Sequence, residues 1–225
     1  MKDKSMVVLS ALLVAGLLGS CAGSPKPSAG TQSGPRLVLN LEPGPHYAKT
    51  MGIFPARYTV QPQVAVWLET TEGKYLDTIY VTARSERGNW RMAPKEGRPE
   101  ALPVWSHLKQ GRADGVSSAT MTADTVTYGN GIAAGLSTGR YIVMLETNRS
   151  YDWNGQYSKE NAGVSGQPSL IYRAELIIGA DRTEARFHPI GTGSVDGADG
   201  TIRSGLEGID TALELFSSMT VSYEM

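Results

Sequence analysis

The stretch that decides the fold is QVAVWLETTEGKYLDTIYVTA, residues 63–83. Its first part, Gln63 to Glu69, is almost continuously apolar, which is typical of a strand buried on both faces. Thr70 to Lys74 contains Gly73 and predicts a hairpin turn, and the β-branched and aromatic residues of Tyr75 to Ala83 predict the returning strand. The hairpin indicates a core built mainly from β-strands.

Further strands are predicted on both sides of this hairpin. Leu37, Leu39 and Leu41 alternate with Val38 and Asn40, which is the period of a strand. Strand patterns also cover Gly139–Glu146, Leu170–Gly179, Glu184–Ile190 and Thr220–Tyr223. About seven strands separated by turn residues predict an immunoglobulin- or fibronectin-like two-sheet β-sandwich.

One short helix is predicted near the C-terminus, over Ile209–Met219. Asp210 is suited to cap its first turn, and Leu213 and Phe216 would share one apolar face. The predicted fold class is therefore mainly β, with one short C-terminal helix.

The N-terminus has the pattern of a bacterial lipoprotein signal peptide. Lys2 and Lys4 precede a short apolar run, residues 7–18, and two small residues lead directly into Cys21. Cleavage before Cys21 would leave it as the lipidated first residue. One alternative is a transmembrane helix, for which the run is short because spanning needs about 20 apolar residues. The other is an ordinary secretory signal.

This pattern divides the chain into three parts. Residues 1–20 are the predicted signal peptide, residues 21–35 a flexible tether rich in Gly, Ser and Pro, and residues 36–225 a single β-sandwich domain. The predicted location is extracytoplasmic and membrane-anchored, on the periplasmic side or the cell surface. In a Gram-negative host, Ala22 after the cysteine would point to the outer membrane.

Composition excludes several functions. A formal charge of −1 predicts no nucleic-acid partner. Cys21 is the only cysteine, so a lipid on it leaves no disulfide, thiol nucleophile or cysteine metal site. His46, His107 and His188 lie in separate segments without the short spacing of a metal site, and nothing links a serine to a histidine and an acid. We therefore predict no catalytic residue and no metal site.

Four stretches together point to one protein family. They are Val64–Thr82, the loop Gly97–His107, the segment Tyr141–Ser150 continued by Asp152 and Asn154, and Gly166–Tyr172. They resemble a family of predicted periplasmic bacterial proteins classed as a domain of unknown function. The resemblance covers roughly Leu37 to the C-terminus and implies a compact extracytoplasmic β-sandwich, found near PepSY-type membrane proteins and flavin transferases. It implies no established reaction.

A second resemblance concerns Asp114–Thr120, which reads Asp-Gly-Val-Ser-Ser-Ala-Thr. It is similar to the acceptor sequence on which a flavin transferase attaches FMN to the last threonine of electron-carrying subunits. The resemblance implies covalent FMN on Thr120, with Asp114, Ser117 and Ser118 in the acceptor loop. Ser118 stands where that family has glycine. The alternative is a polar loop between strands, in which Asp114 and the hydroxyls bind backbone amides.

A possible groove is predicted next to Thr120, lined by Arg98, Glu100, Trp105 and His107. An aromatic ring and an arginine together can hold a planar ligand. The alternative is that Trp105 braces the loop against the sandwich while Arg98 pairs with Glu100.

Two other polar stretches have open interpretations. Asp196 and Asp199 lie in a glycine-rich segment that could hold calcium or form a turn. Residues 151–161 interleave acidic and amide side chains with aromatic ones, which suits sugar binding or a long loop folded on itself.

The sequence thus predicts a non-catalytic, lipid-anchored interaction or accessory module of the cell envelope, without a cofactor and with the membrane as partner. The alternative is an extracytoplasmic electron-transfer protein that carries FMN on Thr120 and has envelope redox proteins as partners.

Overall fold

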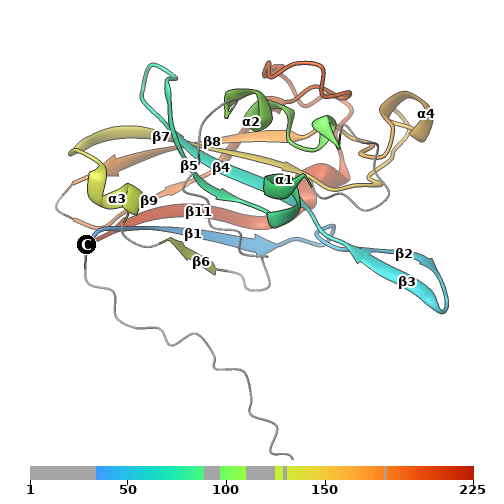
Figure 1. The fold of residues 1–225 in the computed structure, drawn as a ribbon, viewed down its shortest axis with the longest axis horizontal. Coiled ribbons are helices and arrows are strands. Elements are labelled where there is room, and N and C mark those ends of the chain that lie inside the picture. Colours follow the sequence, from blue (N-terminus) through green and yellow to red (C-terminus); the bar gives the residue numbers. More distant parts are fainter. Residues whose placement is uncertain (1–33, 89–96, 110–124, 129–130, 180) are drawn as a thin grey trace, which may run out of the picture. The chain divides into compact units, whose positions relative to one another are not determined.

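Two antiparallel sheets and one separate hairpin form the framework of the structure (Figure 1). The computed structural model describes residues 34–88, 97–109, 125–128, 131–179 and 181–225. The predicted mainly β class and two-sheet sandwich are confirmed. The predicted signal peptide, Cys21 and most of the tether lie outside the described residues.

The smaller sheet has the strand order β6-β1-β11-β9. Its members are β1 (Arg36–Pro43), β6 (Thr125–Tyr128), β9 (Thr183–Arg186) and β11 (Phe216–Glu224). β1 lies between β6 and β11 and pairs antiparallel with both. Leu37, Leu39 and Leu41 are buried, so the predicted alternation along β1 is confirmed.

The larger sheet has the order β10-β8-β7-β4-β5. Its members are β4 (Gln63–Glu69), β5 (Tyr75–Val81), β7 (Gly139–Asn148), β8 (Leu170–Ile178) and β10 (His188–Thr192). The predicted hairpin of β4 and β5 is confirmed, with a backbone hydrogen bond of 2.9 Å from Thr70 N–H to the Lys74 carbonyl in its turn.

The larger sheet is covered on both faces, and this explains why β4 is apolar throughout. Val64, Val66 and Leu68 pack into the core between the two sheets, together with β1 and β11. Ala65 and Trp67 point the other way and pack into a second core. That second core is closed by the segment around α2 (Pro103–Leu108), which Figure 1 shows on the side of the sheet away from β1 and β11.

The remaining helical elements are single turns. They are α1 (Ala83–Arg87), η1 (Pro99–Ala101), α3 (Gly131–Gly135), α4 (Lys159–Ala162) and η2 (Thr211–Glu214). In the part of the chain that the structure describes, no helix has the length and apolar character needed to span a membrane.

The C-terminal helix is shorter than predicted. Only η2 is helical, and Asp210 caps it by accepting a hydrogen bond from the Thr211 N–H. From Phe216 onward the chain is strand β11, because it pairs along its length with β1 and buries Phe216, Met219 and Val221. The pairing supplies backbone hydrogen bonds and burial that outweigh the local helical pattern.

The predicted strand over Glu184–Ile190 is divided into two. It breaks at the buried Phe187, so that β9 belongs to the smaller sheet and β10 to the larger one. Strand β6 was not predicted.

A second hairpin was also not predicted, because its residues lie in a Pro- and Gly-rich segment. It consists of β2 (Lys49–Ile53) and β3 (Ala56–Val60), which pair only with each other among the described strands. Ile53 faces Ala56, so Phe54 and Pro55 form its two-residue turn. Gly52 has φ 87°, and a Cβ there would lie 2.2 Å from the Ala56 carbonyl oxygen, so this turn requires glycine.

Candidate functional site

The most exposed large apolar side chains on the described surface include two on the β2–β3 hairpin. Phe54, in the turn, is 83% exposed, and Tyr58, on β3, is 52% exposed. Figure 1 shows the hairpin extending beyond the end of β1, away from the two larger sheets. Side chains in this position can contact another surface without hindrance from the sandwich.

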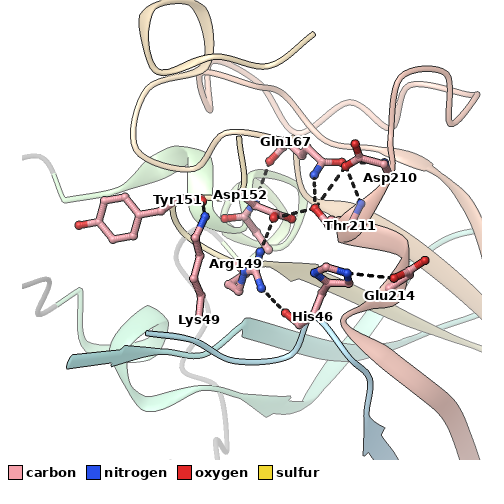
Figure 2. Close-up of polar contacts among 10 residues, drawn as sticks. His46, Lys49, Arg149, Tyr151, Asp152, Gln167, Asp210, Thr211 and Glu214 are labelled. Carbon is pink, nitrogen blue, oxygen red and sulfur yellow. Dashed lines mark hydrogen bonds and ion pairs between the residues drawn. The ribbon is translucent and has the colours of Figure 1, made fainter. Parts of the chain in front are cut away.

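The base of the hairpin is held by a buried ion pair at the end of β7. Arg149 and Asp152 are paired, and each side chain is only 4% exposed. The Arg149 guanidinium also donates to the backbone carbonyl of His46, just before β2 (Figure 2). The ion pair therefore fixes the chain as it enters the hairpin.

This ion pair belongs to a larger network that joins three segments (Figure 2). Thr211 Oγ1 donates to Asp152 Oδ1 at 2.8 Å, and Gln167 Nε2 donates to Thr211 Oγ1 at 2.8 Å. The Asp210 N–H donates to Gln167 Oε1 at 2.9 Å. The end of β7, the segment before β8 and the turn before β11 are thus held together next to the start of the hairpin.

Two further contacts bind the residues at the start of the hairpin, His46 and Lys49. His46 Nε2 lies 3.1 Å from Glu214 Oε2, and Lys49 Nζ donates to the Tyr151 carbonyl at 2.5 Å (Figure 2). Within the described residues, Asp152 Oδ2 and Arg149 Nε are buried without a hydrogen-bond partner. Loss of either member would leave the other charge buried without its partner, which is costly.

Aromatic side chains from the hairpin and from the end of β7 lie side by side. Tyr151 and Trp153 make an edge-to-face contact with their ring centroids 5.5 Å apart, and Lys49 Nζ lies 5.9 Å from the Trp153 ring. A side-chain hydrogen bond with Tyr151 raises the pKa of the Tyr58 hydroxyl. We call Phe54, Arg57, Tyr58, Tyr151 and Trp153 together the hairpin surface.

Tyr151 is held in an uncommon backbone conformation within this surface. Its φ is 63°, and it is the one non-glycine residue with positive φ in the described chain. Its N–H donates to the Val164 carbonyl at 2.7 Å. Left-handed backbone is unfavourable for a bulky side chain, so the surrounding network has to maintain it.

Of the four predicted groove residues, Trp105 lies deepest. It is 1% exposed in the second core, and its Nε1 donates to Thr78 Oγ1 at 2.9 Å. The ring is therefore not accessible to a planar ligand in this structure.

The other three groove residues are engaged in the loop around α2. Arg98 donates to Glu100 Oε1 at 2.8 Å and also to the hydroxyls of Ser150 and Ser165. His107 Nδ1 lies 2.8 Å from the Pro103 carbonyl. The bonds from Arg98 to Ser150 and Ser165 hold the loop to the sandwich, whereas the other two contacts lie within the loop.

The predicted flavin acceptor lies outside the described residues. Asp114, Ser117, Ser118 and Thr120 belong to residues 110–124, whose placement the structure does not describe. Covalent FMN on Thr120, and its closeness to Trp105, stay predictions.

A buried acid that sequence analysis missed lies beside α2. Glu146 on β7 is fully buried, and its carboxylate accepts hydrogen bonds from the Ser169 hydroxyl at 2.6 Å, the Val104 N–H at 3.2 Å and the Trp105 N–H at 2.8 Å. Burial raises its pKa to about 7, although these three donors oppose the shift. An acid directly after the apolar run Ile142–Leu145 was the available signal. Its position fits a structural clamp on α2.

The two other polar stretches have local explanations. Asp196 accepts hydrogen bonds from Ser194 and Ala198, and Asp199 pairs with Arg203, which lowers the pKa of Asp199 to about 2. Across the described ranges, no three His, Cys, Asp or Glu side chains are grouped so that they could hold a metal ion.

Within residues 151–161, the amide side chains are bound mainly to the loop itself, while Asn154 Nδ2 also donates to the Gly208 carbonyl at 2.9 Å. Asn154 Oδ1 accepts from the backbone of Gln156 and Tyr157, and Asn161 Nδ2 donates to the Gln156 carbonyl. Trp153 Nε1 donates to the Gly163 carbonyl at 2.8 Å. These contacts are those of a loop folded on itself.

The sequence contains one Gly-x-Ser-x-Gly pattern, at residues 135–139. In a hydrolase such a serine stands on a sharp turn from strand to helix. Here the order is reversed, since Gly135 ends α3 and Gly139 begins β7. The pattern therefore lacks the structural context of a nucleophile.

The fold and contacts define the class of this protein as a mainly β, two-sheet sandwich with a projecting, firmly based hairpin. Comparison with protein-family models, curated proteins and solved structures finds no match.

Proposed function

We propose that this protein is a lipid-anchored interaction or accessory module of the cell envelope, with no catalysis of its own. The observation that carries the proposal is a contrast between two regions. Around α2, the polar side chains of Arg98, Glu100 and Glu146 bind groups within the fold. On the hairpin, Phe54 and Tyr58 are exposed, and the base of the hairpin is bound to the buried pair of Arg149 and Asp152.

The anchor is supported by the N-terminal sequence. A short apolar run and two small residues precede Cys21, and the Gly-, Ser- and Pro-rich segment that follows has the composition of a flexible tether. Fourteen residues, 22–35, separate Cys21 from the start of β1 at Arg36. Fully extended, such a tether spans about 50 Å, which lets the sandwich contact partners at some distance from the lipid.

The anchor is tested by mass spectrometry of protein purified from membranes of the native host. We expect an N-terminal peptide that begins at Cys21 and carries the mass of a lipid, and we expect no lipid in Cys21→Ser. An N-terminal peptide that retains residues 1–20, or an unmodified Cys21, would overturn this part of the proposal.

The contact role is tested with a photo-crosslinking amino acid placed in the native host at residue 54 or, as a control, at residue 177. Ile177 on β8 is also exposed, at 49%, but lies outside the hairpin. We expect adducts with envelope components at residue 54 and not at residue 177. Equal yields at both positions would refute a specific contact through the hairpin.

A further inference from the structure

We propose that the tip of the β2–β3 hairpin inserts into the headgroup region of an anionic lipid bilayer, with Phe54 at the acyl boundary and Arg57 beside the phosphates. The inference rests on the proposed function, because it names the partner of the hairpin surface defined above. It adds a second membrane contact to the one made through Cys21.

The shape and composition of the tip suit shallow insertion. Phe54 and Pro55 are the two turn residues, both are exposed, and Phe54 has the largest exposed fraction among the large apolar side chains of the described surface. Because the turn lies at the end of a two-stranded projection, Phe54 can leave water without burial of the domain behind it. Burial of a phenylalanine ring is strongly favourable.

Amphipathic aromatic rings lie behind the tip. Tyr58, Tyr151 and Trp153 gather where the hairpin meets the end of β7. Each ring combines an apolar body with a polar end, and such rings favour the interface between lipid and water. The αL conformation of Tyr151 contributes to this arrangement at a cost in backbone energy.

The charge of the hairpin segment favours an anionic lipid surface over a neutral one. Residues 43–62 contain Lys49, Arg57 and His46 but no aspartate or glutamate, although the whole chain has a formal charge of −1. Lys49 is bonded to the Tyr151 carbonyl at the base, whereas Arg57 is exposed near the tip. Basic residues near a bilayer are attracted to anionic headgroups.

The tether permits both contacts on one membrane. From Arg36 at the start of β1 to Ile53 at the end of β2 the chain has 18 residues, which span at most about 59 Å at about 3.3 Å per residue. The tether reaches about 50 Å when extended. A domain tilted toward the membrane can therefore keep its lipid and its hairpin in the same bilayer.

The test uses the mature chain, residues 21–225, with Cys21→Ser, so that no lipid of its own contributes. Co-sedimentation is measured with vesicles of phosphatidylethanolamine and phosphatidylglycerol, and with vesicles of phosphatidylcholine. We expect binding to the anionic vesicles, a loss of about tenfold in Phe54→Ala, and no change in Ile177→Ala, the matched control. Arg57→Gln should weaken binding to the anionic vesicles only.

A second measurement reports the position of the tip. In Phe54→Trp, the added tryptophan fluorescence should shift to shorter wavelength on binding and be quenched by lipids brominated in their acyl chains. Unchanged melting temperatures would show that the variants at residue 54 remain folded, which the exposure of Phe54 predicts.

Three outcomes would overturn the inference. They are no binding to either vesicle, equal losses in Phe54→Ala and Ile177→Ala, and hairpin-dependent binding to an acidic envelope protein without binding to vesicles. The result is separable from the anchor, because an unlipidated Cys21 refutes the anchor while leaving the vesicle measurement unchanged.

Discussion

The backbone N–H of Trp105 donates a 2.8 Å hydrogen bond to Glu146 Oε2, which joins α2 to a strand 41 residues further along the chain. The same carboxylate also accepts from Val104 and Ser169, and no cation is among these partners. Burial without a cation raises the pKa of Glu146 to about 7. The clamp on α2 is thus linked to proton binding.

We therefore expect stability to fall as pH rises from about 5 to 8. In this range the unfolded chain has lost the Glu146 proton, whereas the folded protein retains it up to about its raised pKa. The decrease in the free energy of unfolding is complete above that pKa and amounts to about 3 kcal/mol. Urea unfolding at several pH values measures how the free energy of unfolding changes with pH. The variant Glu146→Gln should lack this decrease.

Glu175→Gln is the control for this pH dependence, because Glu175 is an exposed carboxylate on β8. The free energy of unfolding of Glu175→Gln should change with pH as it does in the wild type. If Glu146→Gln also kept the wild-type pH dependence, the role of Glu146 would be contradicted.

The buried pair of Arg149 and Asp152 should be costly to break. Asp152→Ala leaves the Arg149 charge buried without its partner, and we expect a loss of about 3–5 kcal/mol in the free energy of unfolding. Replacing both, with Arg149→Met and Asp152→Ala in one chain, should cost less than the sum of Arg149→Met alone and Asp152→Ala alone. Chemical denaturation of the single and double variants gives the coupling energy.

An exposed pair on the larger sheet supplies the comparison. Arg140 and Glu175 are 66% and 39% exposed, so Glu175→Ala should change stability by less than about 1 kcal/mol. If Asp152→Ala cost no more than this, the network would not be the base of the hairpin.

Gly52→Ala should disturb the hairpin locally. The added Cβ would lie 2.2 Å from the Ala56 carbonyl oxygen at a φ of 87°, so the turn has to shift. We expect faster amide hydrogen exchange in β2 and β3, with little change elsewhere. Gly73→Ala, in the β4–β5 turn, has φ 80° but no atom within 4 Å of the new Cβ, and it should leave exchange in β2 and β3 unchanged.

The flavin alternative is tested by intact mass and visible absorption of protein from the native host. The proposed function predicts a colourless chain without FMN. A yellow protein that loses the mass of FMN in Thr120→Ala, but retains it in Thr122→Ala, would instead establish an electron carrier.

The local sequence pattern was sufficient for strands that alternate between buried and exposed residues and for strands that are buried throughout. The alternation of Leu37, Leu39 and Leu41 and the apolar run of β4 predicted both strands correctly. It predicted only the second half of β11, over Thr220–Tyr223, and wrongly extended a helix into the first half, because the partner strand β1 lies far away in the sequence, with Arg36 opposite Glu224. It also failed for the β2–β3 hairpin, since Gly52 and Pro55 suggested only an irregular turn.

The sequence by itself determined the mainly β class, the paired strands β4 and β5, and the residue types available for a site, because these follow from composition and from patterns over a few residues. Tertiary structure alone decided that Trp105 is buried, that Glu146 clamps α2 and that Arg149 supports the hairpin. The reason is physical. Each of these contacts joins residues about 40 to 100 positions apart, and their energies depend on burial that exists only after the sheets have packed.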